Sequence, residues 1–418
     1  MREMRNSGIE WIGHIPNEWK VNSLFQIFTQ VKNKNTGLKE KNLLSLSYGK
    51  IKRKSIDSIG GLLPENFDGY NIIEADDIVL RLTDLQNDHT SLRVGLSTER
   101  GIVTSAYLTI RNRSENNPKY LYYYIHSFDI AKGFYGMGAG VRQGLNWDGV
   151  KWLKFTIPTV TEQNKIVSFL DEKCAEIDTV IEKTKETVEE YKKLKQSVIT
   201  QAVTKGIRPN RPMKDSGIEW IGEIPADWDI NTAFQLFTQV KNKNIGLVET
   251  NLLSLSYGKI KRKSIDTIGG LLPESFDGYN IIESDDIVLR LTDLQNDHTS
   301  LRVGLATERG IVTSAYLTLR NRSDNLPMFL YYYLHSFDVA KGFYGMGAGV
   351  RQGLNWDGLK WLKIVSPSVQ EQQEIISYLN KKCSEIDELI AKKTSLLSEL
   401  ESYKKSLIYE YVTGKKEV

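Results

Sequence analysis

Two short segments of the chain carry the residue types best suited to binding a nucleic acid. Ser45 to Lys54 reads SLSYGKIKRK and places an aromatic residue beside a glycine and four cations, and lysine and arginine bind phosphates. Arg81 to Arg93 reads RLTDLQNDHTSLR. Its arginine, glutamine, asparagine and aspartate side chains match the edges of guanine, adenine and cytosine. We therefore expect the first segment to contact phosphates and the second to read bases.

Both segments recur 209 residues further along, and RLTDLQNDHTSLR recurs unchanged from Arg290 to Arg302. An ordinary hydrophilic loop or a solvated charged face would carry similar residues, so the repetition is the observation that favours binding. A third, weaker candidate is the loop Val141-Arg142-Gln143 and its copy. The predicted nucleic-acid-binding residues are Tyr48, Lys50, Lys52, Arg53, Lys54, Arg81, Thr83, Asp84, Gln86, Asn87, Arg93, Arg142, Gln143, Tyr257, Lys259, Lys261, Arg262, Lys263, Arg290, Thr292, Asp293, Gln295, Asn296, Arg302, Arg351 and Gln352.

No catalytic, cofactor or metal motif emerges from the sequence. The glycines Gly136, Gly138 and Gly140 follow an expected helix instead of a strand, which does not fit a dinucleotide-binding turn. No phosphate-binding GxxxxGK[ST] motif is present, and the five histidines lack metal-ligand spacing. Asp84, Asp88 and His89 could form a metal cluster, but a polar loop is the simpler interpretation. We therefore expect a chain without catalytic residues, bound metal or cofactor of its own.

The chain consists of two copies of one unit. The same offset, 220 − 11 = 209 for the tryptophans Trp11 and Trp220, holds without a gap from Ser7/Ser216 to Thr204/Thr413. Between residues 42 and 109, only four of 68 positions differ from the second copy, whereas between residues 184 and 202 only four positions are identical. Each copy therefore combines a conserved body (1–158 and 215–367) with a long segment that has diverged.

The long segments are predicted to be helices, Glu162 to Thr204 and Glu371 to Thr413. Apolar residues recur in them at alternating steps of four and three, which is the pattern of a coiled coil, and both helices begin at a capping-box sequence, Thr159-x-x-Glu162 and Ser368-x-x-Glu371. Because a lone helix would leave its apolar stripe in water, we expect an antiparallel pair. The seam residues are Leu170, Cys174, Ile177, Ile181, Thr184, Val188 and Tyr191 in the first helix and Leu379, Cys383, Ile386, Ile390, Leu397 and Leu400 in the second.

Each body has the pattern of a small α+β domain. Expected strands are followed by a helix that begins at Pro118, by a glycine-rich loop and by a short helical turn. Trp11, Pro16 and Trp19 are expected to pack near one end of the long helices. The expected strands of the first body are Leu43 to Ser47, Ile78 to Leu82, Val94 to Leu96 and Ile102 to Ile110.

Several motifs together resemble the DNA specificity subunits of type I restriction-modification systems. They are SGIEWIGHIPNEW near the N-terminus, G-x-R-Q-x-L from Gly140 to Leu145, Ile157-Pro158-x-x-x-Glu162-Gln163, and the helix end Ala202-Val203-Thr204-Lys205-Gly206. The resemblance implies two target-recognition domains, 1–158 and 215–367, each reading half of a split DNA site. It also implies two spacer helices, 159–205 and 368–414. A linker, 206–214, joins the first of these helices to the second body.

In such systems, two methyltransferase subunits dock on the spacer helices, and a further subunit carries cleavage and ATP-driven translocation. The resemblance thus implies that S-adenosylmethionine and ATP bind partner subunits and that this chain binds double-stranded DNA. The N-terminal MREMRNSGIEWIG has no apolar run of signal-peptide length, so we expect a cytoplasmic protein without a membrane span.

The resemblance implies two different recognition domains, since members of this family generally carry such a pair and read asymmetric sites. The chain departs from this pattern because its two bodies are nearly identical. A symmetric reader favours a symmetric site, so we expect the target to be an inverted repeat of one half-site around a fixed spacer. Two other interpretations remain: a coiled-coil scaffold that does not bind DNA, and a self-contained methyltransferase or nuclease.

Overall fold

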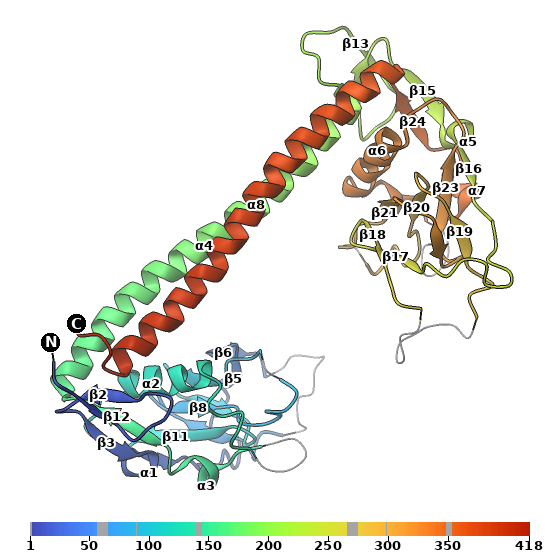
Figure 1. The fold of residues 1–418 in the computed structure, drawn as a ribbon. Helices are drawn as coiled ribbons and strands as arrows, with labels where there is room; N and C mark the ends of the chain where they lie inside the picture. Colours follow the sequence, from blue (N-terminus) through green and yellow to red (C-terminus); the bar gives the residue numbers. More distant parts are fainter. Residues whose placement is uncertain are drawn as a thin grey trace. The chain divides into compact units, whose positions relative to one another are not determined.

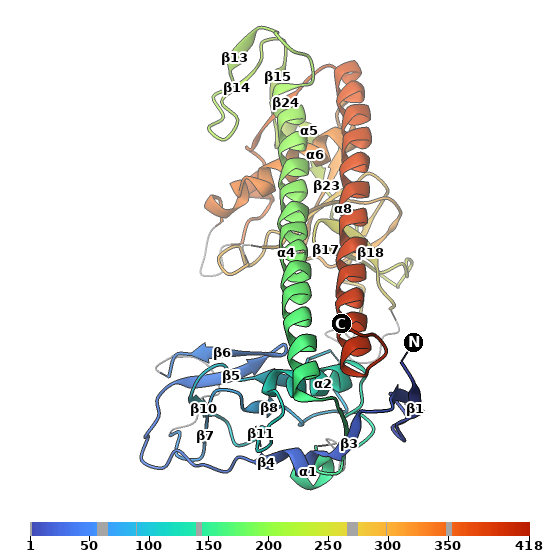
Figure 2. The same cartoon turned by 90° about the vertical axis from the view of Figure 1, so that its left-hand side faces the viewer.

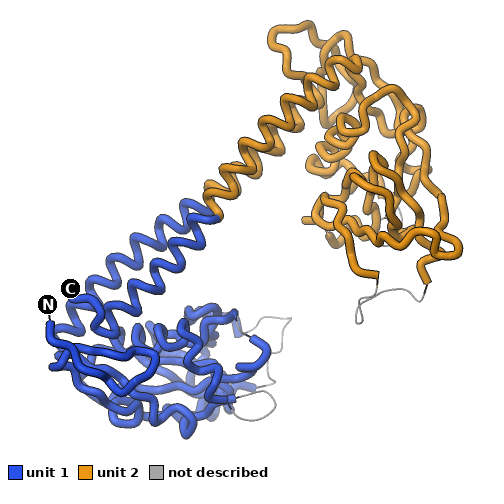
Figure 3. The backbone as a smooth tube through the Cα atoms, viewed as in Figure 1, with its two compact units in different colours: residues 1–185, 395–418 blue, residues 186–394 orange. Residues whose placement is uncertain are grey.

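The structure is a computed structural model that describes residues 2–56, 66–88, 90–138, 144–265, 275–297, 299–347 and 353–418 (Figure 1). The chain divides into two compact units, Met1–Lys185 with Ser395–Val418 and Glu186–Thr394 (Figure 3). Each unit contains one body together with a stretch of both long helices, α4 (Val160–Lys205) and α8 (Val369–Val412). None of the helices in the described ranges combines the length and the apolar character that crossing a membrane requires.

Within the residues that the structure describes, the first body is built from short strands and three helices, in agreement with the expected α+β class. Its helices are α1 (Leu24–Ile27), α2 (Pro118–Ile130) and α3 (Trp147–Val150). Its strands are β1 (Met4–Asn6), β2 (His14–Pro16), β3 (Lys20–Ser23), β4 (Phe28–Gln30), β5 (Leu43–Ser47), β6 (Lys50–Lys54), β7 (Asn71–Ile73), β8 (Ile78–Leu80), β9 (Val94–Leu96), β10 (Gly101–Val103), β11 (Leu108–Asn112) and β12 (Lys154–Ile157).

Two four-stranded sheets form the centre of the first body. One has the order β6-β5-β10-β7, in which β5 and β10 are parallel, and the other has the antiparallel order β4-β11-β8-β9. The predicted strand from Ile102 to Ile110 is wrong, because β10 and β11 belong to different sheets. A turn closed by Tyr107 N–H donating to the Thr104 carbonyl, 3.1 Å, separates them. The predicted strand from Ile78 also ends two residues early, at Leu80.

The second body repeats the antiparallel sheet, whereas the counterpart of the other sheet consists of two strand pairs, β17-β18 and β19-β22, which the isolated parallel bridge between Leu252 and Ile311 connects. Its sheet β16-β23-β20-β21 corresponds to β4-β11-β8-β9, residue pair by residue pair. Its elements are β13 (Met213–Asp215), β14 (Glu223–Pro225), β15 (Asp229–Thr232), α5 (Ala233–Leu236), β16 (Phe237–Gln239), β17 (Leu253–Ser256), β18 (Lys259–Arg262), β19 (Asn280–Ile282), β20 (Ile287–Leu289), β21 (Val303–Leu305), β22 (Gly310–Val312), β23 (Leu317–Asn321), α6 (Pro327–Val339), the 3₁₀ turn η1 (Gly342–Gly345), α7 (Trp356–Leu359) and β24 (Lys363–Ser366).

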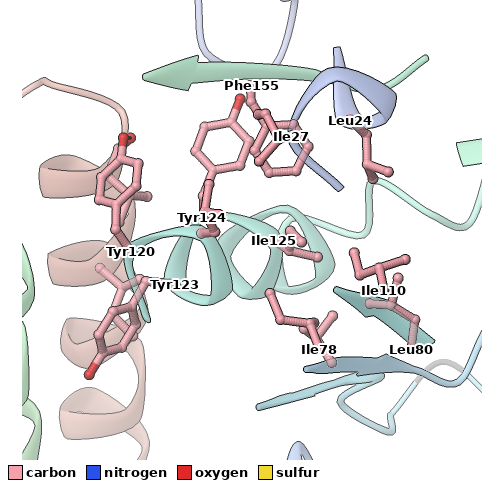
Figure 4. Packing of buried hydrophobic residues seen from close by; sticks show 14 of the residues in the cluster. Leu24, Ile27, Ile78, Leu80, Ile110, Tyr120, Tyr123, Tyr124, Ile125 and Phe155 are labelled. Atoms are coloured by element: carbon pink, nitrogen blue, oxygen red, sulfur yellow. Dashed lines mark hydrogen bonds between the residues drawn. The ribbon is translucent and has the colours of Figure 1, made fainter. Parts of the chain in front are cut away.

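Helix α2 joins the first body to the long helices of its unit. Tyr124 and Ile125 pack toward the sheet and β12, while Tyr120 and Tyr123 lie beside α8 (Figure 4). The Tyr120 hydroxyl is buried within 2.9 Å of the Thr156 carbonyl and 3.1 Å of the Val412 carbonyl. The aromatic face of this helix therefore belongs to the core.

The predicted antiparallel pairing of the long helices is confirmed within each unit (Figure 2). In the first unit, Asp178 of α4 pairs with Lys404 of α8 at 2.6 Å. In the second unit, Lys195 of α4 pairs with Asp387 of α8 at 2.6 Å. The numbering along one helix rises as that along the other falls. Cys174 and Cys383 are free thiols buried in the seam, as their spacing predicted.

The start of each long helix differs in one respect from the predicted capping box. Glu162 N–H donates to Thr159 Oγ1 at 3.3 Å, which is the expected first half. The Glu162 carboxylate, however, accepts from Trp19 Nε1 at 3.2 Å and from Arg2 Nη1 at 2.6 Å. The second half of the box is therefore wrong, because the carboxylate binds the N-terminal segment instead of its own helix. The same bonds explain why Trp19 packs at the helix end.

Candidate nucleic-acid interface

The first predicted segment forms a β-hairpin whose tip is Tyr48-Gly49. Strands β5 and β6 pair in register up to Ser47 and Lys50, which leaves a two-residue turn. Tyr48 has φ 47° and Gly49 has φ 75°, and a turn with two positive φ angles matches the right-handed twist of the strands. Tyr48 is 76% exposed at this tip, and its copy Tyr257 is 74% exposed. The hairpin thus presents an aromatic ring to solvent.

The cations of this hairpin lie on two different faces. Lys50, Lys52 and Lys54 alternate with Ile51 and Arg53, so the three exposed lysines share one face. Ile51 on the other face packs against the core cluster of Leu44 and Leu46. In the second copy, Lys259 and Lys261 share a face of β18 in the same way, and Lys263 follows the strand directly.

Arg53 is engaged by a neighbouring carboxylate. Its Nε donates to both Glu99 oxygens, at 2.8 and 2.9 Å, and this hydrogen bonding raises the pKa of the guanidinium. Arg262 makes the same pair with Glu308. The side chain of Arg53 remains 73% exposed. Because Glu99 offsets its charge, Arg53 is a weaker candidate for phosphate binding than the three lysines.

The second predicted segment is a loop that joins β8 to β9. Thr83, Gln86 and Asn87 are exposed on it, and Arg81 and Asp84 are partly exposed. Asp84 adopts φ 58°, and its Oδ1 accepts from Asn87 Nδ2 at 2.8 Å. The copy repeats this geometry: Asp293 has φ 56° and accepts from Asn296 at 2.7 Å, and Thr292, Gln295 and Asn296 are exposed.

Arg81 lies near an acidic residue of the same loop. Its Nη2 is 3.8 Å from Asp88 Oδ2, and the corresponding distance from Arg290 to Asp297 is 3.7 Å. The side chains of Arg81 and Arg290 are 36% and 38% exposed. Both arginines therefore keep an accessible guanidinium at the start of the loop.

Arg93 and Arg302 do not fit the prediction that they read bases. Their side chains have no exposed area, and the guanidinium groups bond to backbone carbonyls inside their own loops. A base could reach them only if the loop were dismantled. They are internal supports of the loop in this structure, which corrects the sequence interpretation.

The structure brings the two predicted segments together. A Cβ atom added to Gly49 would lie 3.1 Å from Leu92 Cβ, so the hairpin tip packs closely on the end of the Arg81–Arg93 loop, which we name the base-reading loop after its predicted role. In the second body, Gly258 N–H donates to the Leu301 carbonyl at 3.2 Å. Each body therefore carries one continuous surface made of a basic hairpin and a polar loop. We call these surfaces the hairpin–loop surfaces.

The third candidate lies outside the described residues, since Arg142, Gln143, Arg351 and Gln352 all fall in ranges that the structure does not describe. His89 and His298 do so as well. Leu145, which is described, donates its N–H to the Leu82 carbonyl at 2.8 Å, and Leu354 donates to Leu291 at 2.9 Å. The chain after the glycine-rich segment thus contacts the start of the base-reading loop.

Two residues that contact the loop were missed by the sequence reasoning. The Tyr135 hydroxyl donates to the Asp88 carbonyl at 3.0 Å, and Asp129 Oδ2 accepts from the Arg93 N–H at 2.6 Å. Burial raises the pKa of the Asp129 carboxyl to about 6. Both residues lie more than 35 positions from the loop, and no local pattern marks them. In the described part of the chain, no group of three His, Cys, Asp or Glu residues is placed to bind a metal ion.

Comparison with known proteins gives a consistent result. A Methanocaldococcus jannaschii protein named as the MjaX specificity subunit of a type I restriction enzyme is 24% identical over 390 residues, which cover 88% of this chain and 87% of that protein. The resemblance to type I specificity subunits is confirmed. No protein-family model matches the chain.

The fold agrees with that of a chain in a solved structure of a type I restriction-modification system. A chain from a structure on complex assembly and conformational transition of the type I restriction-modification system has a TM-score of 0.69 at 14% identity, and the match covers 96% of this chain and 99% of that chain. The HsdS subunit from Thermoanaerobacter tengcongensis matches with a TM-score of 0.48, 14% identity, and coverage of 96% and 98%. The first of these matches supports an architecture of two α+β bodies with two long antiparallel helices.

Proposed function

We propose that this chain is the DNA-recognition subunit of a type I restriction-modification system and that each hairpin–loop surface reads one half of a bipartite site. The observation that carries this proposal is the duplicated surface, on which exposed lysines of a hairpin lie beside a loop with exposed Thr83, Gln86 and Asn87. Lysines that share a hairpin face suit phosphates, and amide side chains suit adenine edges. The likeness to type I specificity subunits supports the same function.

The target has the form of an inverted repeat. The two bodies differ at only four of the 68 positions between residues 42 and 109, and none of these four positions lies in the hairpin or in the base-reading loop. Two identical readers recognise two identical half-sites. The lengths of α4 and α8, 46 and 44 residues, set the spacer between the half-sites.

Methyl transfer, cleavage and translocation belong to partner subunits in this proposal. Two methyltransferase subunits dock on the long helices, and S-adenosylmethionine and ATP bind the partners. The restriction subunits join this complex to complete the system.

Methylome sequencing tests the proposal directly. The chain is expressed with its neighbouring methyltransferase gene in a host that lacks type I systems, and a strain with the methyltransferase gene alone is the control. We expect new adenine or cytosine methylation at one split, inverted-repeat motif that depends on this chain. Two unrelated half-sites would refute the symmetry argument, and methylation that does not depend on this chain would refute the recognition role.

A further inference from the structure

The buried arginine of each base-reading loop sits at the centre of a closed hydrogen-bond network. The loop begins and ends at a backbone pair, in which Arg81 N–H donates to the Arg93 carbonyl at 2.9 Å. From that end, the Arg93 side chain turns back under the loop. Its exposed fraction is zero, and so is that of Arg302.

All five N–H donors of Arg93 have an acceptor. Nη1 donates to the carbonyls of Arg81 and Thr83 at 3.0 and 2.8 Å. Nη2 donates to the carbonyls of Asp84 and Asp88 at 3.3 and 2.5 Å. Nε donates to the Tyr135 hydroxyl at 3.2 Å. Arginine has five donors in a planar fork, so the network leaves none for DNA.

The network is repeated in the second body. Arg302 bonds to the carbonyls of Arg290 and Thr292 at 3.1 and 2.9 Å and to the hydroxyl of Tyr344 at 3.2 Å. The guanidinium carbons of Arg93 and Arg302 lie 5.1 Å from the ring centres of Tyr135 and Tyr344. The same tyrosine thus packs against the guanidinium and accepts from it in both copies.

This arrangement determines which groups face solvent. Four loop carbonyls point toward the guanidinium, whereas Thr83, Gln86 and Asn87 expose their side chains on the outside of the loop. A loop that is ordered before binding loses less conformational entropy when DNA arrives. Lysine cannot replace the arginine, because an ammonium group has three donors and no planar fork.

We propose that Arg93 and Arg302 are positioning residues that set the sequence specificity of the two half-sites by holding each base-reading loop in its binding shape. This inference rests on the proposed function. The arginines act through Thr83, Gln86 and Asn87 and their copies. They touch neither base nor phosphate.

The test compares Arg93→Lys, Arg302→Lys and the double variant in the full chain, assembled with its methyltransferase partners. Binding is measured on a duplex that carries the methylated site found by sequencing and on duplexes mutated in one half-site. We expect each single variant to lose at least about tenfold in preference for the true site over the mutated duplexes. The affinity for non-specific DNA and its dependence on salt should stay unchanged, since a lost phosphate contact would lower the salt slope by about 0.9.

Two further variants separate positioning from general damage. Tyr135→Phe removes one acceptor of the network and keeps the ring, so it should give a smaller loss of preference and should fold even if Arg93→Lys does not. Arg111→Lys breaks a fork to Asp77 at 2.7 Å elsewhere in the same body and should lower stability without changing preference. Hydrogen exchange of residues 82–88 should rise in Arg93→Lys.

The outcomes separate the inference from the proposed function. If the unmodified protein shows no preference among duplexes, the proposed function fails. If it discriminates and the Arg93→Lys loop exchanges faster while preference is unchanged, the positioning role is refuted. If Arg93→Lys instead lowers the salt slope and loses the same affinity on all duplexes, Arg93 contacts a phosphate. That result would also refute the positioning role.

Discussion

Replacing Lys50, Lys52 and Lys54 by alanine removes the exposed cations of one hairpin face without touching the core. Each side chain is exposed, and none of the three forms an ion pair with another described residue. If each lysine binds one phosphate, the slope of log affinity against log salt falls by about 0.9 for each, or about 2.7 in total. Between 50 and 200 mM salt, the advantage of the unmodified protein over the triple variant therefore shrinks by about 40-fold.

The measurement is fluorescence anisotropy of a labelled duplex at several salt concentrations, with non-specific DNA so that base readout does not contribute. A control in the same hairpin is Arg53→Ala combined with Glu99→Ala, which removes a cation and an anion together and leaves the net charge unchanged. We expect this control to keep the slope of the unmodified protein. An unchanged slope in the triple-lysine variant would show that this face does not contact phosphates, and the assignment of the hairpin would fall.

Three further predictions concern the framework. Lys404→Glu should lower the free energy of unfolding by about 0.5–1 kcal/mol, since Lys404 and Asp178 pair at 2.6 Å across the helices. Adding Asp178→Lys should restore part of this loss. A double-mutant cycle measured by urea unfolding that showed no coupling would count against the prediction. Glu371→Gln should destabilise the protein by about 3 kcal/mol and Glu162→Gln by about half as much. The reason is burial, because the Glu371 side chain is 3% exposed and that of Glu162 is 21% exposed. Equal losses of stability in chemical unfolding would contradict the role of burial. Burial and nearby lysines lower the pKa of His126 and His335 to about 4, so the stability that they contribute is present above pH 6.5 and is lost as pH falls toward 4. The variant with both His126→Gln and His335→Gln should therefore lose less stability over that range, by about 1–3 kcal/mol for each histidine, and parallel melting-temperature profiles of the two proteins would disprove this.

Much of the framework could be predicted from the sequence because its signals are local or periodic. A heptad pattern of about forty residues defines each long helix. The second strand of the hairpin, β6, was not predicted. The break between β10 and β11 was not predicted, since the turn at Thr104, Ser105 and Ala106 contains neither glycine nor proline to mark the passage from one sheet to the other.

The candidate site could be predicted only in part. The sequence shows an arginine at each end of the loop and does not distinguish them. In the structure, the Arg81 side chain is partly exposed, whereas the Arg93 side chain is buried. The difference depends on Tyr135 and Asp129, which reach the loop from a distant segment. The use of Glu162 is also non-local, because its partner Trp19 lies 143 positions away.

The two ion pairs between the long helices are equivalent, but helix α4 supplies the aspartate in one pair and the lysine in the other. Asp178 and Asp387 are equivalent, as are Lys195 and Lys404, because 387 − 178 = 404 − 195 = 209. A contact that recurs with its members exchanged is the property of an isologous interface. The helix pairing therefore has the chemistry of a homodimer joined into one polypeptide.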